Sequence, residues 1–151
     1  MKNLLNLFAF KGDYPIIVKD VEGKFFENEN FSIEAQNMTH GIPCNSYKFI
    51  LKGQLKIDKK KLNKMKIPGG PHLKNLKKGK NLFYEGKEYS AKNLISKEKD
   101  RIIALVLDTS FNSKIIPFVK YSDIFICEST FTSELESKAR EYKHLTVNQA
   151  A

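Results

Sequence analysis

The chain is poor in cysteine, tryptophan and long apolar runs. Its 151 residues contain no tryptophan and two cysteines, Cys44 and Cys127. Two distant thiols in a lysine-rich chain are typical of reduced cytosolic residues and argue against a disulfide framework. No window approaches the ~18 uninterrupted apolar residues of a membrane-spanning helix, so no membrane partner is expected. The run from Leu4 to Phe10 is broken by Asn6 and lacks a small-residue cleavage site, and so does not fit a signal peptide.

What is present suits one globular domain, residues 1–151. A chain of this length can bury a core, and 41% hydrophobic residues exclude wholesale disorder. The net charge of +9 favours a polyanionic partner.

Acidic residues are nearly missing from one segment. Residues 52–80 hold eleven lysines against a single acid, Asp58, whereas the rest of the chain is close to neutral. A solvated surface in a lysine-rich proteome is one explanation, since Arg101 and Arg140 are the only arginines. Ile67–Pro71 (IPGGP) predicts a loop within this basic segment. Lysines around such a loop suit contact with phosphates, and we favour nucleic-acid binding.

Before the basic segment, β-branched and alternating residues predict strands at 15–20, 31–35 and 46–51. A turn at 27–30 and a polar corner at Thr39–Gly41 would make them an antiparallel meander. Inside the segment we expect a helix over 58–65 capped by Asp58, a helical turn at 73–78 and a hairpin at 82–89. Residues 53–95 are interpreted as an arm inserted into the domain, with too few apolar residues for a core of its own.

After the arm the pattern becomes α/β. Continuous apolar runs at 102–107 and 124–127 flank an amphipathic stretch at 115–119, which predicts a parallel strand pair buried on both faces. Asp108 and Glu128 would then share the rim at the carboxyl ends of these strands. Capping boxes are expected at 133–136 and 146–149, and the second helix is cut short at Ala151, which favours a truncated chain.

Four residues could carry chemistry, each at the end of a predicted element: His40, Asp108, Glu128 and His144. Each also has a structural explanation, as a turn residue, a helix cap, a solvated strand end or a helix-terminus histidine. Imidazole and carboxylate together suit zinc.

Other residues are weaker candidates for this chemistry. His72 is interpreted as a surface or nucleic-acid contact. Cys44 could join a metal site by type, although a lone cysteine on a strand is more often a core residue. No short metal motif is present, and spacing alone does not predict a complete metal site.

The motifs, in order, resemble the middle of ribonuclease Z, the tRNA 3′-end endonuclease family of the metallo-β-lactamase superfamily. Residues 31–49 resemble its metal-histidine region, and Ile67–Pro71 with Leu76–Gly79 resembles the Gly-Pro segment of its tRNA-gripping arm. Leu107-Asp-Thr, Glu128-Ser-Thr-Phe and Tyr142-Lys-His-Leu-Thr resemble its Gly-Asp-Thr, His-Glu-Ala-Thr-Phe and Tyr-x-His-Ser-Thr motifs.

The resemblance implies a role for each residue. His40 would be a terminal zinc ligand and Asp108 the carboxylate that bridges two zinc ions. His144 would be the catalytic histidine near the scissile phosphate, with Glu128 supporting it. The arm would hold the tRNA through Lys59, Lys60, Lys61, Lys64, Lys66, Gly70, Pro71, Lys74, Lys77 and Lys78.

The chain departs from the family pattern at Thr39, Leu107 and Cys127, none of which replaces an implied ligand. The upstream His-x-His-x-Asp-His motif and a late metal histidine are missing. Only two of about seven family ligands are therefore present, too few to hold a zinc pair.

We therefore expect an internal fragment of ribonuclease Z, a partial metallo-β-lactamase αβ/βα sandwich with an inserted basic exosite arm. Its parent would remove the 3′ trailer from precursor tRNA with zinc, as a cytoplasmic homodimer, while this chain alone would be nearly inactive. Two alternatives stay open: a non-catalytic RNA-binding module, and a metallo-β-lactamase-fold enzyme acting on small phosphodiesters.

Overall fold

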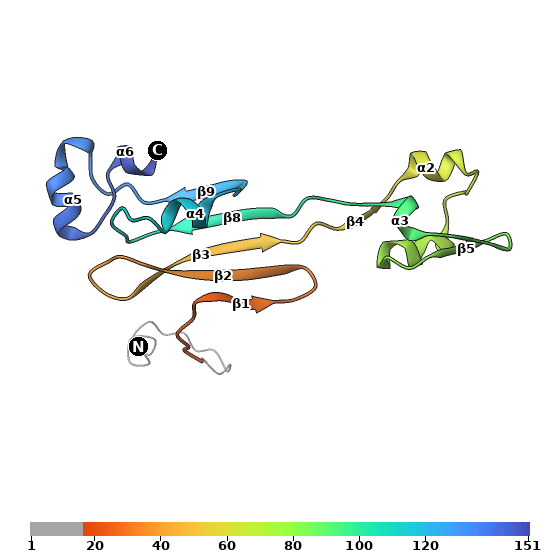
Figure 1. Cartoon of the computed structure of the whole chain (residues 1–151), viewed down its shortest axis with the longest axis horizontal. Coiled ribbons are helices and arrows are strands. Elements are labelled where there is room, and N and C mark those ends of the chain that lie inside the picture. The colour runs from red at the N-terminus through yellow and green to blue at the C-terminus, as the bar shows by residue number, and fades with distance from the viewer. Residues whose placement is uncertain (1–16) are drawn as a thin grey trace, which may run out of the picture.

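A computed structural model describes residues 17–151 and shows an elongated molecule with a sheet at one end and the arm at the other (Figure 1). The strand expected at 15–20 is wrong where it can be judged, because residues 17–20 form no strand. The first strand lies further along, at Gly23–Glu27. The run from Leu4 to Phe10 lies outside the described residues.

Five strands form the main sheet in the order β1-β2-β3-β8-β9. Their bounds are β1 Gly23–Glu27, β2 Phe31–Met38, β3 Cys44–Leu51, β8 Arg101–Val106 and β9 Ile124–Cys127. The first four pair antiparallel and β8 pairs parallel with β9. The predicted meander, now starting at β1, and the parallel pair are both confirmed, as is the mixed α/β class.

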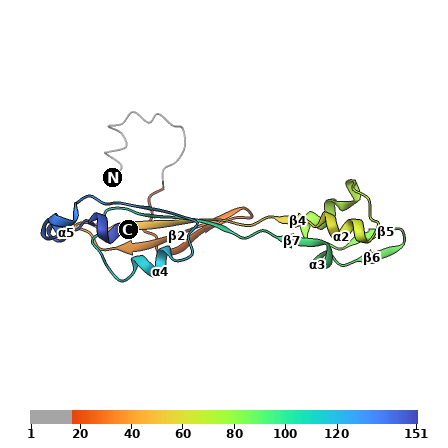
Figure 2. The same ribbon diagram turned by 90° about the horizontal axis from the view of Figure 1, so that it is seen from above.

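One face of the sheet carries a compact apolar cluster. Helix α4, Ile115–Val119, lies on this side, as Figure 2 shows. Its Ile115 and Phe118 pack with Met38, Val106 and Leu145, all at most 8% exposed. The cluster holds together the strand ends from which the candidate residues project.

The opposite face is apolar but open. Residues paired in register lie on the same face, and the pairs Ile33–Phe49 and Tyr47–Leu105 line this one. Tyr47 is 41% exposed and Ile126 of β9 is 47% exposed. The prediction that β8 and β9 are buried on both faces is therefore wrong for the described residues, since a helix covers only one side.

The arm contains short elements in a compact order: β4 Leu55–Ile57, α2 Lys59–Lys64, the 3-10 helix η1 Pro71–Lys78, β5 Leu82–Tyr84, β6 Lys87–Tyr89, α3 Ala91–Leu94 and β7 Ile95–Lys97. β4 pairs with β7, and β5 and β6 form the predicted hairpin. The Asp58 side chain accepts hydrogen bonds from the backbone N–H groups of Lys60 and Lys61, which confirms the predicted cap.

The expectation that the arm lacks a core is wrong. It encloses its own cluster of buried apolar side chains, separate from that of the sheet: Leu62, Ile67, Leu73, Leu76, Leu82, Ala91 and Leu94. The apolar residues are few, but α2, η1, β5 and α3 each contribute one or two of them, and Ile67 adds one from the loop before η1. The arm is thus a packed unit rather than a loose loop.

Short helices end the chain: η2 Ser133–Leu135, α5 Glu136–Tyr142 and α6 Val147–Ala150. The capping box formed by Thr146 and Gln149 is present. The side chains of the N-cap residues of η2 and α5 make no capping hydrogen bond, so the box expected at 133–136 does not form. Among residues 17–151, no helix has the length and apolar character needed to cross a membrane.

Candidate functional site

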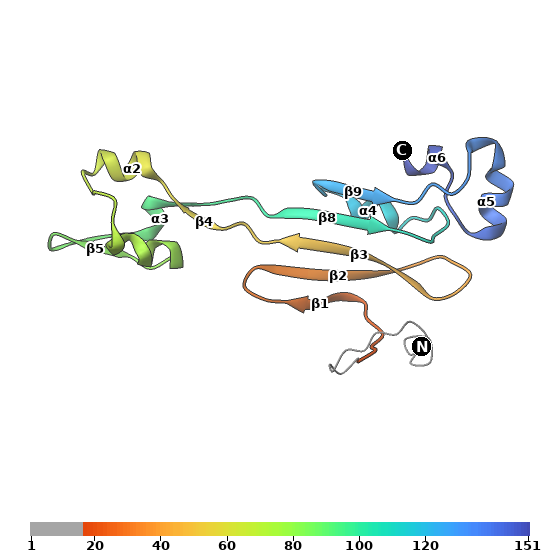
Figure 3. The same cartoon turned by 180° about the vertical axis from the view of Figure 1, so that it is seen from behind.

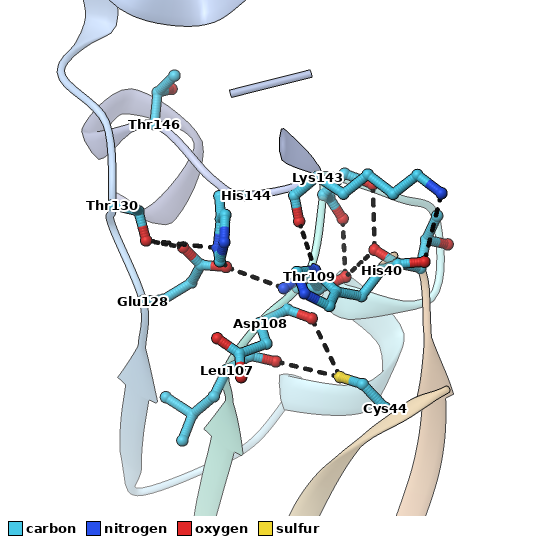
Figure 4. Close-up of polar contacts among 12 residues, drawn as sticks. His40, Cys44, Leu107, Asp108, Thr109, Glu128, Thr130, Lys143, His144 and Thr146 are labelled. Carbon is cyan, nitrogen blue, oxygen red and sulfur yellow. Dashed lines mark hydrogen bonds and ion pairs between the residues drawn. The ribbon is translucent and has the colours of Figure 1, made fainter. Parts of the chain in front are cut away.

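The four candidate residues meet at one rim of the sheet (Figure 4). Asp108 follows β8, Glu128 follows β9, His40 lies in the corner between β2 and β3, and His144 follows α5. Ligand atoms of Asp108, Glu128 and His144 all lie within 4.8 Å of one another. The His40 and His144 rings are 5.0 Å apart between centroids. The sequence placed Asp108 and Glu128 on this rim, and the fold adds both histidines.

The carbonyl of Thr39 ties the corner that carries His40 to the loop after β8. It accepts hydrogen bonds from the Thr109 hydroxyl at 3.2 Å, the Ser110 hydroxyl at 3.2 Å and the Ser110 N–H at 2.9 Å. Thr109 is fully buried. Asp108 itself adopts a left-handed backbone, φ 48°, which turns the chain sharply where β8 ends. The positions of His40 and Asp108 are therefore set by the same backbone group.

Glu128 and His144 form a partly buried pair. The Glu128 Oε1 atom is 2.9 Å from His144 Nδ1, and the two side chains are only 9% and 22% exposed. Oε1 also accepts the Thr109 N–H at 2.9 Å, while Oε2 accepts the Thr130 hydroxyl at 2.5 Å. Both carboxylate oxygens of Glu128 are thus engaged by donors that fix its orientation.

These donors decide the ionisation of Glu128. Burial by itself raises the pKa of this carboxyl, but the hydrogen bonds from Thr130, the Thr109 N–H, His144 and the Leu145 N–H together outweigh it. The pKa of Glu128 is lowered, and the group is a carboxylate at neutral pH.

Hydrogen-bond chemistry also fixes which ring nitrogens carry protons. His40 Nδ1 is 3.0 Å from the Lys143 carbonyl, which can only accept, so Nδ1 is the donor. His144 Nδ1 likewise faces the Glu128 carboxylate. In the neutral imidazoles the lone pair is then on Nε2 of both rings. A carboxylate or carbonyl behind a histidine is the arrangement that orients a metal ligand or a proton acceptor.

Asp108 completes the group. In residues 17–151 its exposed carboxylate takes part in no hydrogen bond or ion pair, unlike that of Glu128. A free carboxylate beside an imidazole is a donor set that zinc accepts. The resemblance implied His40 and Asp108 as metal ligands, whereas the tightest grouping in the structure is Asp108, Glu128 and His144, with His40 beside it.

Cys44 lies next to this group without belonging to it. Its thiol donates to the backbone oxygen of Asp108 at 3.0 Å. Burial, followed by the charges of Asp108 and Glu128, raises the pKa of Cys44, so the thiol keeps its proton. Cys44 therefore braces the loop after β8, in line with the structural reading of a lone cysteine.

The residues expected to bind nucleic acid all lie in the arm and are all exposed: Lys59, Lys60, Lys61, Lys64, Lys66, Gly70, Pro71, Lys74, Lys77 and Lys78. Lys61 is the one among them that has an acidic partner in the described chain, Asp58 at 3.8 Å. His72 is used internally, since Nε2 donates to the Pro68 carbonyl at 3.0 Å and the ring stacks on Tyr84. It shapes the loop that presents the lysines.

Sequence reasoning missed Thr109, Thr130 and Lys143, which hold the rim together through a backbone N–H, a hydroxyl and a carbonyl. The sequence contains a signal for two of them, because Thr109 and Thr130 follow the acids Asp108 and Glu128 by one and two residues. The Lys143 carbonyl has no side-chain signature, so only the fold could reveal it.

Comparison with known proteins points in one direction. No family model matches the chain. Ribonuclease Z of Oceanobacillus iheyensis is 34% identical over all of this chain and 51% of its own length. Ribonuclease Z of Nanoarchaeum equitans is 30% identical over 99% of this chain and 48% of its own length. Ribonuclease Z of Clostridium novyi is 38% identical over 79% of this chain and 39% of its own length.

The alignments with the Oceanobacillus and Nanoarchaeum proteins include the arm as well as the sheet and its rim, since they cover 100% and 99% of this chain. The chain spans about half the length of the curated relatives it matches. It is therefore related to ribonuclease Z along its whole length and corresponds to about half of such a protein.

Proposed function

We propose that this chain provides part of a zinc-dependent endoribonuclease that removes the 3′ trailer from precursor tRNA. The observation that carries the proposal is the His144–Glu128 pair beside Asp108 and His40, in a chain related throughout to ribonuclease Z. From the family resemblance we also propose a cytoplasmic homodimer for the complete protein.

The donor set fits zinc. Asp108 offers a carboxylate, and His40 presents an unprotonated Nε2 because its Nδ1 donates to the Lys143 carbonyl. Zinc bound here would supply an activated water and charge stabilisation at the phosphoryl oxygens. We propose His40 and Asp108 as ligands, in keeping with the free carboxylate of Asp108.

His144, held by Glu128, would lie near the scissile phosphate and transfer the proton in the reaction. The carboxylate holds the His144 ring through Nδ1, which leaves Nε2 to accept or return a proton at the reacting oxygen. The Glu128 carboxylate thereby fixes the orientation of the ring from which the proton would move. Thr109 and Thr130 hold Glu128 in place and act through it.

The arm would grip the body of the tRNA. Lysines give affinity for phosphates without reading sequence, as required of an enzyme that processes many tRNAs. We propose residues 53–95 as the exosite arm and the open apolar sheet face as the inner side of a partial αβ/βα sandwich. The exposed Tyr47 and Ile126 on that face support this assignment.

A chimaera tests the proposal directly. The matched half of ribonuclease Z from Oceanobacillus iheyensis is replaced by this chain, and cleavage of a precursor tRNA is measured. We expect cleavage, reduced by roughly 10²–10⁴-fold in His144→Ala. Lys138→Ala is the control, because Lys138 is exposed on α5 and takes no part in the contacts of the rim described above. Full activity of His144→Ala would refute the role of the pair.

The isolated chain serves as a second test. With His40 and Asp108 as its only proposed ligands, we expect near-zero zinc after dialysis and no cleavage of precursor tRNA. Near two zinc ions per chain, or robust cleavage, would contradict this ligand assignment.

A non-catalytic RNA-binding module is the second candidate, favoured by the exposed arm lysines. It predicts salt-sensitive tRNA binding by the chain and an inactive chimaera. An enzyme acting on small phosphodiesters predicts instead that deletion of residues 53–80 leaves activity intact, whereas we expect that deletion to abolish cleavage of precursor tRNA.

A further inference from the structure

The chain passes between the sheet and the arm twice, once on the way out and once on the way back (Figures 1 and 3). The β3–β8 ladder ends at the pair Leu51–Arg101, and the β4–β7 ladder begins at Leu55–Lys97. Three residues on each passage, 52–54 and 98–100, therefore lie outside both ladders. Without other contacts such a junction would let the arm swing, since backbone torsions rotate freely where no ladder holds them.

Gly53 brings the two passages into direct contact. A Cβ atom at this position would lie 1.8 Å from the Glu98 carbonyl oxygen, far inside van der Waals distance. Only glycine permits this approach. The Glu98 N–H donates to the Gln54 carbonyl at 3.0 Å beside it.

Asp100 replaces the missing ladder partner of Gly53. Its Oδ1 accepts the Gly53 N–H at 2.9 Å, which satisfies a backbone donor that the end of the β3–β8 ladder leaves unpaired. This hydrogen bond is the main reason that the pKa of Asp100 is lowered, so the acceptor is charged at neutral pH. The Lys97 ammonium lies 3.5 Å from the same oxygen.

The sheet side of the junction is anchored as well. The Lys52 N–H donates to the Asn30 carbonyl at 2.8 Å, and its ammonium lies 2.7 Å from Glu27. The residue before Gly53 is thereby fixed to the turn between β1 and β2. The contact of Gly53 with Asp100 and Glu98 then transmits this anchorage to the passage that leaves the arm.

We infer that Gly53, Glu98 and Asp100 form a clamp that fixes the direction of the arm, and that this direction places a tRNA held by the arm at the rim. The second part of the inference rests on the proposed function. Gly53 and Asp100 are positioning residues, since they touch neither the rim nor any of the lysines proposed to hold the tRNA. A fixed direction raises the effective concentration of the tRNA 3′ end at the rim.

The clamp is tested on the full chain by small-angle X-ray scattering of its monomer fraction. Gly53→Ala forces the passages apart and Asp100→Ala removes the acceptor, so both should broaden the distance distribution at its longest distances. Asp100→Asn keeps an oxygen acceptor and should resemble the unmodified chain. Gly69→Ala is the control, because a Cβ there meets nothing within 4 Å. Unchanged distributions in both Gly53→Ala and Asp100→Ala would overturn the clamp.

Positioning is tested with an iron chelate tethered to the rim. Ser129→Cys, with Cys44 and Cys127 replaced by serine, places the chelate beside Glu128, and radical cleavage of bound tRNA then reports which nucleotides lie there. We expect one confined set of cleavages, dispersed in Gly53→Ala and Asp100→Ala and restored in Asp100→Asn, at an affinity changed less than about twofold because the arm lysines are intact. Identical cleavage patterns in all variants would overturn the positioning role.

The two failures are distinguishable. If the unmodified chain does not bind tRNA at all, the proposed role of the arm fails and the positioning role fails with it. The scattering comparison still decides whether the clamp exists, because it requires no RNA.

Discussion

The arm and the sheet differ in how completely they bury their apolar side chains. The arm, less than a third of the chain, closes its apolar residues into a core in which Leu76 and Leu94 are fully buried. The sheet is larger, yet a helix covers only the face beneath α4, and Ile124 and Ile126 on the other face stay about half exposed, at 52% and 47%. The arm therefore needs no further partner to pack, whereas the sheet presents an apolar surface that favours association.

The difference predicts that the isolated chain self-associates through the sheet. Ile124→Lys with Ile126→Lys should convert an associated chain into a monomer, because two charges on the β9 edge oppose pairing. Size-exclusion chromatography with light scattering measures the change. Phe83→Lys is the matched control, since Phe83 is 71% exposed but belongs to the arm. A stable monomer before any substitution would refute the prediction.

The two regions also differ in charge, and in this respect the arm is the region that we expect to bind a partner. Each phosphate-contacting lysine that is removed should lower the slope of log affinity against log salt by about one. Three arm substitutions to glutamine should therefore reduce the slope for tRNA by about three: Lys60, Lys64 and Lys77. Three exposed lysines of the sheet end serve as the control and should change it little: Lys19, Lys120 and Lys138. Equal losses from both sets would mean that net charge, and not the arm, governs binding.

Two matched leucines test whether the cores are independent. Leu76 in the arm and Leu145 beneath the sheet are both fully buried. Either Leu→Ala change should cost about 2–5 kcal/mol. Hydrogen exchange should locate the loss of Leu76→Ala within residues 55–97 and that of Leu145→Ala in the sheet. Exchange that rises throughout the chain in either variant would show one cooperative unit instead.

The rim has its own pH signature. The pKa of Glu128 is lowered on folding, so its contribution to stability is present above the unfolded value near 4.5 and is lost as the pH falls through the folded pKa. Glu128→Gln should reduce the free energy of unfolding at pH 7 by about 1–3 kcal/mol. In a plot of the urea midpoint against pH, it should also flatten the acid limb, where the midpoint falls as the pH is lowered. Glu134→Gln is a control, because the pKa of Glu134 is also lowered but its carboxyl is fully exposed. An unchanged acid limb in Glu128→Gln would contradict the assignment.

How far the sequence could predict these features depended on how local their causes are. The Asp58 cap, the 82–89 hairpin and the parallel pair follow from neighbouring residues, and each is present. The strand expected at 15–20 rested on β-branched composition alone, and residues 17–20 form no strand. The arm core depends on seven apolar residues spread over 33 positions, whose convergence no local pattern shows.

The same distinction applies to the rim. Strand ends placed Asp108 and Glu128 together, because parallel strands share a carboxyl edge. The pairing of His144 with Glu128 requires the chain to return from α5, and the bond from His40 to the Lys143 carbonyl spans 103 residues. Geometry of this kind becomes visible only when the tertiary contacts are formed.

The smallest expected effect separates charge from stability at a single arm residue. Asp58 caps α2 at 3.0 and 3.1 Å to the Lys60 and Lys61 N–H groups and is also the only acid in residues 52–80. Asp58→Asn keeps a good cap and removes the negative charge, whereas Asp58→Ala removes both, at a cost of about 1 kcal/mol to the arm. Because the arm core is closed, both variants should stay folded and bind tRNA slightly more tightly, while only Asp58→Ala melts earlier. Tighter binding by Asp58→Asn together with weaker binding by Asp58→Ala would show instead that the arm grips tRNA through the order of α2 as much as through its charge.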